Sequence, residues 1–251
     1  MQQAGTILGH TKMDILGEAI EWGQADFSEA WRDLSPADLA LLYAYFNQKG
    51  HIDELRIAFH QLFHSYGFEK PPVLIDVGCG PFTSGLAFTS ALPAVKCFKY
   101  IGIDRALSMM ELGEALALEA SRFVECERFW SQDIKNVSWP YGVSYQDVIV
   151  VVSYLLASPT VNISEVVSDL AMLINKVSLG SSCVLYTNSV KPNPNRKLPE
   201  LEEALTQNGF RHVVNENGII NRGSHSAGQQ REFRYALYFR QELDTLPLAT
   251  D

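Results

Sequence analysis

A glycine turn and two acidic residues have the types and spacing that could bind a ligand. A short apolar run containing Asp76 leads directly into the turn Gly78-Cys79-Gly80, and a second apolar run ends at Asp104. Glycines in such a turn let backbone N–H groups approach a ligand that a Cβ atom would keep away. The carboxylate of Asp104 can accept hydrogen bonds from both hydroxyl groups of a ribose. The pattern therefore predicts a site for a nucleoside-containing cofactor.

Three further residues follow later apolar runs and could contact a second ligand. Ser153 and Tyr154 come directly after the run 148–152, and Asn188 comes after the run 183–187. A tyrosine can stack on or hydrogen-bond a planar molecule, and an asparagine amide can orient one. We expect Ser153, Tyr154 and Asn188 to be the catalytic residues of such a site.

Short apolar runs alternate with helical segments after residue 72, and these elements must position the site. Strands are expected at 73–77, 100–103, 128–130, 148–152, 183–187, 210–215 and 233–239. Alternation of strands and helices predicts an α/β, Rossmann-like sheet that is mostly parallel, with helices on both faces. No long helix separates the last two strands, so they should pair as an antiparallel hairpin at one edge of the seven-stranded sheet.

Residues 1–70 have apolar residues at helical spacing, which predicts an N-terminal helical cap ahead of a domain at residues 71–251. Ser35 is a good N-cap and Pro36 suits the first helical position, so a helix should begin there. Gly50 is expected to end that helix, and a second helix should end at Gly67. The helix-spaced aromatic residues of this segment are expected to pack in a core.

The composition excludes several classes of protein. With 251 residues and 47% hydrophobic content the chain can bury a large core, which excludes a disordered chain. Its longest apolar stretch is shorter than the ~20 residues of a membrane-spanning helix, and its first residues do not resemble a secretory signal. The four cysteines lie far apart, which argues against disulfides and a cysteine zinc site. We therefore expect a cytoplasmic protein that binds no metal and no membrane.

The net charge of −9 hides a local excess of basic residues. Residues 188–240 contain eight lysines and arginines against five acidic residues, in an otherwise acidic chain. Such an excess could face an anion such as RNA, although a solvated surface is the more common role.

From residue 72 to residue 240 these motifs resemble those of class I S-adenosylmethionine-dependent methyltransferases. Asp76-x-Gly78-x-Gly80 is similar to the family's first motif, which holds the methionine end of the cofactor. Asp104 matches the family's ribose-binding acid, and Asp133 matches a residue that meets the adenine. The resemblance implies that S-adenosylmethionine contacts Asp76, Gly78, Cys79, Gly80, Asp104, Arg105, Asp133, Ile134 and Ser153.

The chain departs from parts of the family pattern. Phe82 stands where many members have a third glycine, which leaves the shape of the turn open. A weaker likeness, in the segment before the glycine turn and at Tyr154, is to methyltransferases associated with small ribosomal subunits, but their cysteine clusters are absent here. An alternative NAD-binding role is disfavoured by Thr83, because the dinucleotide fingerprint needs glycine at that position.

The resemblance implies transfer of a methyl group from S-adenosylmethionine, and it leaves the acceptor open. The basic excess at 188–240 slightly favours RNA, while the acidic remainder of the chain favours a small molecule or a protein. A further alternative is a non-catalytic scaffold or sensor that keeps the cofactor pocket.

Overall fold

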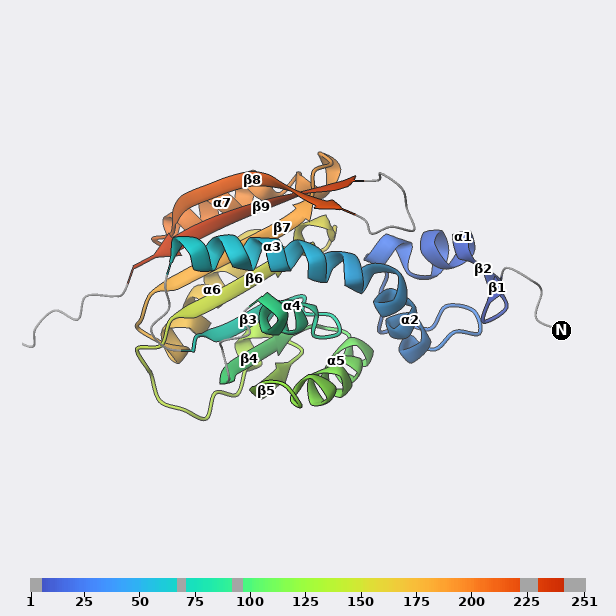
Figure 1. The fold of residues 1–251 in the computed structure, drawn as a ribbon, viewed down its shortest axis with the longest axis horizontal. Coiled ribbons are helices and arrows are strands. Elements are labelled where there is room, and N and C mark those ends of the chain that lie inside the picture. The colour runs from blue at the N-terminus through green and yellow to red at the C-terminus, as the bar shows by residue number, and fades with distance from the viewer. Residues whose placement is uncertain (1–5, 67–70, 92–96, 222–229, 242–251) are drawn as a thin grey trace, which may run out of the picture.

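The computed structural model describes residues 6–66, 71–91, 97–221 and 230–241. Its central element is a seven-stranded sheet in the order β5-β4-β3-β6-β7-β9-β8. The strands are β3 (Val73–Val77), β4 (Cys97–Ile103), β5 (Glu125–Ser131), β6 (Val148–Ser153), β7 (Ser182–Ser189), β8 (Arg211–Asn221) and β9 (Gln230–Arg240). The first five are parallel, and β9 pairs antiparallel with both β7 and β8. The predicted α/β fold with its closing hairpin is confirmed (Figure 1).

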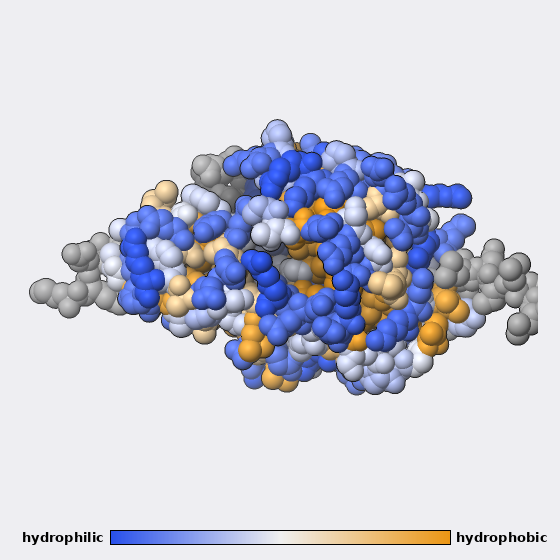
Figure 2. Space-filling view, turned by 180° about the vertical axis from the view of Figure 1, so that it is seen from behind, coloured by the Kyte–Doolittle hydropathy of each residue, from blue (hydrophilic) through white to orange (hydrophobic). Residues whose placement is uncertain are grey.

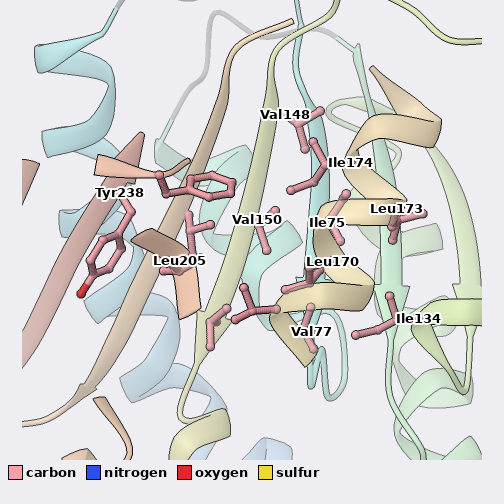
Figure 3. Packing of buried hydrophobic residues seen from close by; sticks show 14 of the residues in the cluster. Ile75, Val77, Ile134, Val148, Val150, Leu170, Leu173, Ile174, Leu205 and Tyr238 are labelled. Atoms are coloured by element: carbon pink, nitrogen blue, oxygen red, sulfur yellow. The ribbon is translucent and has the colours of Figure 1, made fainter. Parts of the chain in front are cut away.

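Helices cover both faces of the sheet. α3 (Lys49–Ser65), α4 (Thr83–Ala91) and α5 (Leu107–Ala120) lie on one face, and α6 (Ile163–Val177) and α7 (Leu198–Gln207) lie on the other (Figure 1). Because helices shield both faces, the central strands β3 and β6 are almost entirely apolar. Figure 3 shows Ile75, Val77 and Val150 of these strands beside Leu170 and Leu173 of α6.

The N-terminal segment departs from the predicted pair of separate helices. α2 (Pro36–Tyr43) begins as predicted, with Ser35 as its N-cap. It does not end at Gly50, because a π-helical turn (Ala44–Gln48) leads it straight into α3. The prediction of a helix end at Gly50 is therefore wrong, and the predicted end at Gly67 lies outside the described residues.

Gly50 serves to leave space rather than to end a helix. A Cβ atom at this position would lie 2.5 Å from Nη1 of Arg231. Glycine inside a helix costs about 1 kcal/mol relative to alanine. The glycine therefore admits the Arg231 guanidinium, a partner from a distant strand that the local sequence pattern does not reveal.

The first N-terminal elements pack against the beginning of α5. They comprise β1 (Thr6–Ile7), β2 (His10–Thr11), α1 (Lys12–Asp14) and the short helices Ile15–Ala19 and Glu21–Gly23. Ile15, Ile20 and Leu39 are buried in one cluster with Ala106 and Met109. α3, by contrast, packs on the sheet with α4, so the second half of the predicted helical cap belongs to the sheet's own layers. The domain boundary at residue 70 stays a prediction.

No helix in the described part of the chain combines the length and the apolar composition needed to cross a membrane. Seen from behind, the molecule is largely covered by hydrophilic residues, and hydrophobic residues show only in limited areas (Figure 2). Among the described residues, no three histidines, cysteines or acidic residues are grouped to hold a metal ion. The cytoplasmic location stays a prediction.

Replacing Gly102 with alanine should destabilise the sheet. Gly102 lies in β4, where a Cβ atom would come 2.5 Å from the Trp130 ring and 2.7 Å from the Tyr100 ring. Overpacking of a core typically costs about 1–3 kcal/mol, so we expect Gly102→Ala to lower the melting temperature in a circular-dichroism melt. Gly142→Ala is the matched control, because no atom lies within 4 Å of that position. Equal melting temperatures for the two variants would contradict the close packing of the aromatic rings on Gly102.

Candidate functional site

A cavity of about 450 Å³ lies at the carboxyl ends of the parallel strands. β3, β4 and β6 contribute Val77, Ile103 and Ser153 to its wall, and the N-terminal segment contributes Phe27 and Tyr43. The carboxyl ends of parallel strands are where open α/β sheets bind ligands. The volume falls within the range of small-molecule sites, about 300–1,000 Å³. This cavity is the candidate functional site.

The glycine turn after β3 forms one edge of the cavity, and its N–H groups are already bonded. Gly78 and Gly80 have φ angles of 71° and 51°, in the left-handed region that favours glycine, and both line the cavity. The N–H groups of Gly78 and Cys79 donate to the Ile103 carbonyl at 2.8 and 3.1 Å. The N–H of Gly80 donates to Asp104 Oδ2 at 2.9 Å. These N–H groups therefore already have partners within the protein, and contact of the turn with a ligand stays a prediction. Cys79 is buried outside the main cavity wall.

Phe82 shows how the chain replaces the third glycine of the family pattern. Its φ angle is 62°, a left-handed conformation that costs a residue other than glycine about 1–2 kcal/mol. Its ring is fully buried and packs edge-on against Tyr100, with ring centroids 4.7 Å apart. Gly85 makes room for this ring, because a Cβ atom there would come 2.1 Å from it. Burial of the aromatic ring offsets the backbone strain, so phenylalanine can occupy this left-handed position.

Asp104 joins the glycine turn to the end of β4. One carboxylate oxygen accepts from Gly80, and the other accepts from the Ala106 N–H at 2.9 Å. Burial raises the pKa of Asp104, and these two hydrogen bonds partly oppose the rise. A carboxylate oxygen can accept more than one hydrogen bond, so both oxygens can also accept from a ligand in the cavity that Asp104 lines.

Asp76 does not line the main cavity itself. Its carboxylate accepts from the hydroxyl groups of Ser84 and Tyr100, the latter at 2.9 Å. It borders a small void of about 20 Å³, which is room for one water molecule. Burial raises the pKa of Asp76 to about 6, although both hydrogen bonds act in the opposite direction. Tyr43, Gly78 and Ser153 line both spaces, so the void adjoins the main cavity.

The far end of the cavity holds the other expected cofactor residues. Arg105, Asp133 and Ile134 all line it. Asp133 caps the short helix Ile134–Asn136 by accepting from the Lys135 N–H at 3.1 Å. Arg105 is exposed and lies 3.7 Å from Asp26 across the mouth. The structure thus brings the strand ends of β4 and β5 to one wall, as the sequence predicted.

Of the three expected catalytic residues, the structure places two at the cavity. Ser153 and Tyr154 line it, and Ser153 Oγ accepts from Thr187 Oγ1 at 2.8 Å. Asn188 is fully buried, and its Nδ2 donates to the Pro194 carbonyl at 3.1 Å. It does not line the cavity, because β7 continues to Ser189 and the Asn188 amide holds the following loop.

A buried polar cluster beside Tyr154 was not predicted. The Tyr154 hydroxyl donates to Glu54 Oε1 at 3.1 Å, and Arg231 Nη2 donates to the same hydroxyl at 2.8 Å. Arg231 also pairs with Glu54 at 2.8 Å. The His51 ring stacks on Tyr154 with centroids 4.1 Å apart, and its Nδ1 lies 3.2 Å from the Tyr43 hydroxyl. The sequence feature that could have predicted this cluster is a pair of polar residues, His51 and Glu54, on an otherwise apolar face of one helix.

Burial moves the pKa values of this cluster in opposite directions. It raises the pKa of Glu54 to about 7, and the neighbouring Arg231 limits the rise. It lowers the pKa of His51 to about 3, and Arg231 adds to this effect. Near neutral pH the His51 ring is therefore uncharged, while Glu54 can gain or lose a proton.

A second, wider depression of about 540 Å³ lies between α5 and β5. It adjoins the main cavity at Gln132 and Asp133. Its acidic residue Glu114 pairs with Arg128 at 2.9 Å and accepts from Trp130 Nε1 at 2.7 Å. Because this carboxylate is already paired, the depression is a weaker candidate than the cavity at the strand ends.

No protein-family model matches the sequence, and no curated protein matches it either. Solved structures do match. A chain of the complex between the Haloferax volcanii Trm112 methyltransferase activator and a protein assigned as a methyltransferase has a TM-score of 0.50 and 11% identity, over 80% of this chain and 96% of that one. The pyocyanin biosynthetic protein PhzM has a TM-score of 0.50 and 16% identity, over 81% of this chain and 58% of that one.

A magnesium protoporphyrin IX methyltransferase from Synechocystis, solved with bound S-adenosylmethionine, covers 92% of both chains at 14% identity and a TM-score of 0.47. The strand order and the closing antiparallel hairpin are those expected from the resemblance of the motifs. The chain has the Rossmann-like fold of class I S-adenosylmethionine-dependent methyltransferases.

Proposed function

We propose that this protein is a methyltransferase that binds S-adenosylmethionine in the cavity at the strand ends. The observation that carries the proposal is the position of Asp104, whose carboxylate lines the cavity between the glycine turn and the end of β4. A carboxylate there suits the two hydroxyl groups of a ribose. When bound, S-adenosylmethionine would supply a methyl group on a positively charged sulfur.

The cavity wall divides into regions that fit the parts of this cofactor. Asp104 would hold the ribose, and Arg105, Asp133 and Ile134 would surround the adenine. Gly78, Gly80 and the nearby Asp76 would contact the methionine part of the cofactor, together with Cys79 of the same turn. Ser153 and Tyr154 would face the reacting methyl group and the acceptor. Holding the two reactants in line can supply much of the acceleration.

For the acceptor, a small molecule is better supported than RNA. The eight basic residues of 188–240 are the basis for an RNA partner, but several are bonded inside the protein. Lys197 donates to three backbone carbonyls, and Arg231 pairs with Glu54. Other internal donors are Arg196, Arg234 and Arg240. Arg222 lies outside the described residues. RNA and protein acceptors remain the alternatives to be tested in a methyl-transfer screen.

Asp104→Ala should abolish or strongly weaken binding of S-adenosylmethionine and of its demethylated product. The variant loses the acceptor for the ribose hydroxyls and frees the Gly80 N–H. Loss of charge-assisted hydrogen bonds worth about 1.5–3 kcal/mol should raise the dissociation constant at least about tenfold. Isothermal titration calorimetry measures the dissociation constant of each ligand.

The matched control is Glu203→Ala, an exposed acid on α7 whose carboxylate accepts a hydrogen bond from Gln207 of the same helix. It should bind like the wild type. If a folded wild type binds neither ligand, the methyltransferase proposal fails and the scaffold alternative takes its place. Unchanged binding by Asp104→Ala would contradict the assigned role of Asp104.

Asp76→Asn should stabilise the fold at neutral pH. Because the folded pKa of about 6 exceeds the ordinary value of 3.8, the folded state holds the proton more tightly, and stability falls as pH rises through this window. Asparagine does not ionise, so the gain should reach at most about 3 kcal/mol above pH 7 and vanish near pH 4. Thermal melts of the wild type and of Asp76→Asn at pH 4 and pH 7.5 measure this gain in stability. An equal difference at the two pH values would show that ionisation of Asp76 is not the cause.

A further inference from the structure

Three elements distant in the sequence meet at the Tyr154 hydroxyl. Tyr154 follows β6, Glu54 belongs to α3, and Arg231 is the second residue of β9. Phe233 of β9 pairs with Ser189, the last residue of β7, so Arg231 lies beyond the carboxyl end of β7. The cluster is therefore on the edge of the sheet where the cavity lies.

Glu54 is the one member of this cluster suited to receive a proton. Its side chain is 0% exposed, and burial of a carboxylate is costly unless it is paired. Oε1 carries both of its contacts, from Tyr154 and Arg231. Oε2 is buried and has no hydrogen-bond partner among the described residues. His51 is a poor alternative, since its pKa lies near 3.

Arg231 holds this arrangement in place. Its Nη2 reaches both the Tyr154 hydroxyl and Glu54 Oε1 at 2.8 Å. Gly50, one helical turn before Glu54, leaves the space that the guanidinium occupies. A fixed positive charge beside the phenol oxygen stabilises negative charge that develops there.

We propose, resting on the function above, that Tyr154 and Glu54 form a proton relay that serves the methyl acceptor. The acceptor's nucleophilic atom is then a hydroxyl oxygen or an amine nitrogen that carries a hydrogen until transfer. Tyr154 is the catalytic residue in this relay, and Glu54 and Arg231 are positioning residues that act through it.

The step balances in atoms and charge. The acceptor atom donates its hydrogen to Tyr154 Oη, and the Tyr154 hydroxyl proton passes to Glu54 Oε1. The acceptor's electron pair forms the new bond to the methyl carbon. The carbon–sulfur bond breaks with its electron pair left on sulfur, which neutralises the sulfonium. Glu54 must release its proton to solvent before the next cycle.

Sinefungin tests the relay without a known acceptor. This analogue of S-adenosylmethionine carries an amine in place of the methyl group, so its ammonium mimics a proton-bearing group at the transfer position. The ammonium can donate to Tyr154 Oη, whose proton goes to Glu54. A charge-assisted bond of this kind should make sinefungin bind about tenfold tighter than S-adenosylhomocysteine at pH 8.

The preference for sinefungin over S-adenosylhomocysteine should depend on pH and on both Tyr154 and Glu54. It should grow between pH 6 and 8, as Glu54 loses its proton among its neighbours Asp53, His51, Tyr154 and Arg231. In Tyr154→Phe and Glu54→Gln the preference and its pH dependence should disappear. S-adenosylhomocysteine carries no ammonium, so in both variants its affinity should change much less than the affinity for sinefungin.

Tyr238→Phe and Glu202→Gln are matched controls, because the Tyr238 hydroxyl donates to Glu202 Oε1 at 3.0 Å in a partly buried pair that does not line the cavity. They should keep the preference. An unchanged preference in Tyr154→Phe and Glu54→Gln overturns the relay. So does an equal loss of both ligands, which indicates a structural cluster. If the wild type binds neither ligand, the proposed function itself fails. This result is distinct from both outcomes that overturn only the relay.

Discussion

The site depends on the hydrogen bonds that tie the glycine turn after β3 to the end of β4. Gly78 and Cys79 donate to the Ile103 carbonyl, and Gly80 donates to Asp104. These bonds extend the parallel pairing of the two strands beyond their last residues, and they hold Asp104 facing the cavity. A ligand that bonds to Asp104 therefore meets a carboxylate already fixed in place, so little ordering entropy is lost on binding.

The N-terminal segment and the closing hairpin complete what the parallel strands begin. Tyr43 lines both the main cavity and the small void beside Asp76, and α3 carries His51 and Glu54 to the side of Tyr154. The antiparallel hairpin returns Arg231 to the carboxyl edge of the sheet. One half of the cavity thus suits a nucleoside, and the other half presents the Tyr154 phenol, whose hydroxyl donates to the buried Glu54 carboxylate.

The sequence predicted the sheet well because its strands are apolar runs between clear turn signals. The bounds of β3 coincide with the run 73–77, and Asp104, Asp133 and Ile134 lie where strand ends place them. Asn188 does not line the cavity because β7 is longer than its apolar run, so the residue lies inside the strand. Arg231 could not be predicted, since its contacts depend on hairpin pairing and on the space at Gly50.

The measurement that tests the account most directly is a crystal structure with S-adenosylhomocysteine. The account predicts both ribose hydroxyls on the Asp104 carboxylate, the adenine beside Asp133 and Ile134, and the sulfur facing Ser153 and Tyr154. The Gly80 bond to Asp104 should persist in the complex. Density for the ligand in the depression between α5 and β5, or an Asp104 without a ligand contact, would contradict the assignment of this cavity.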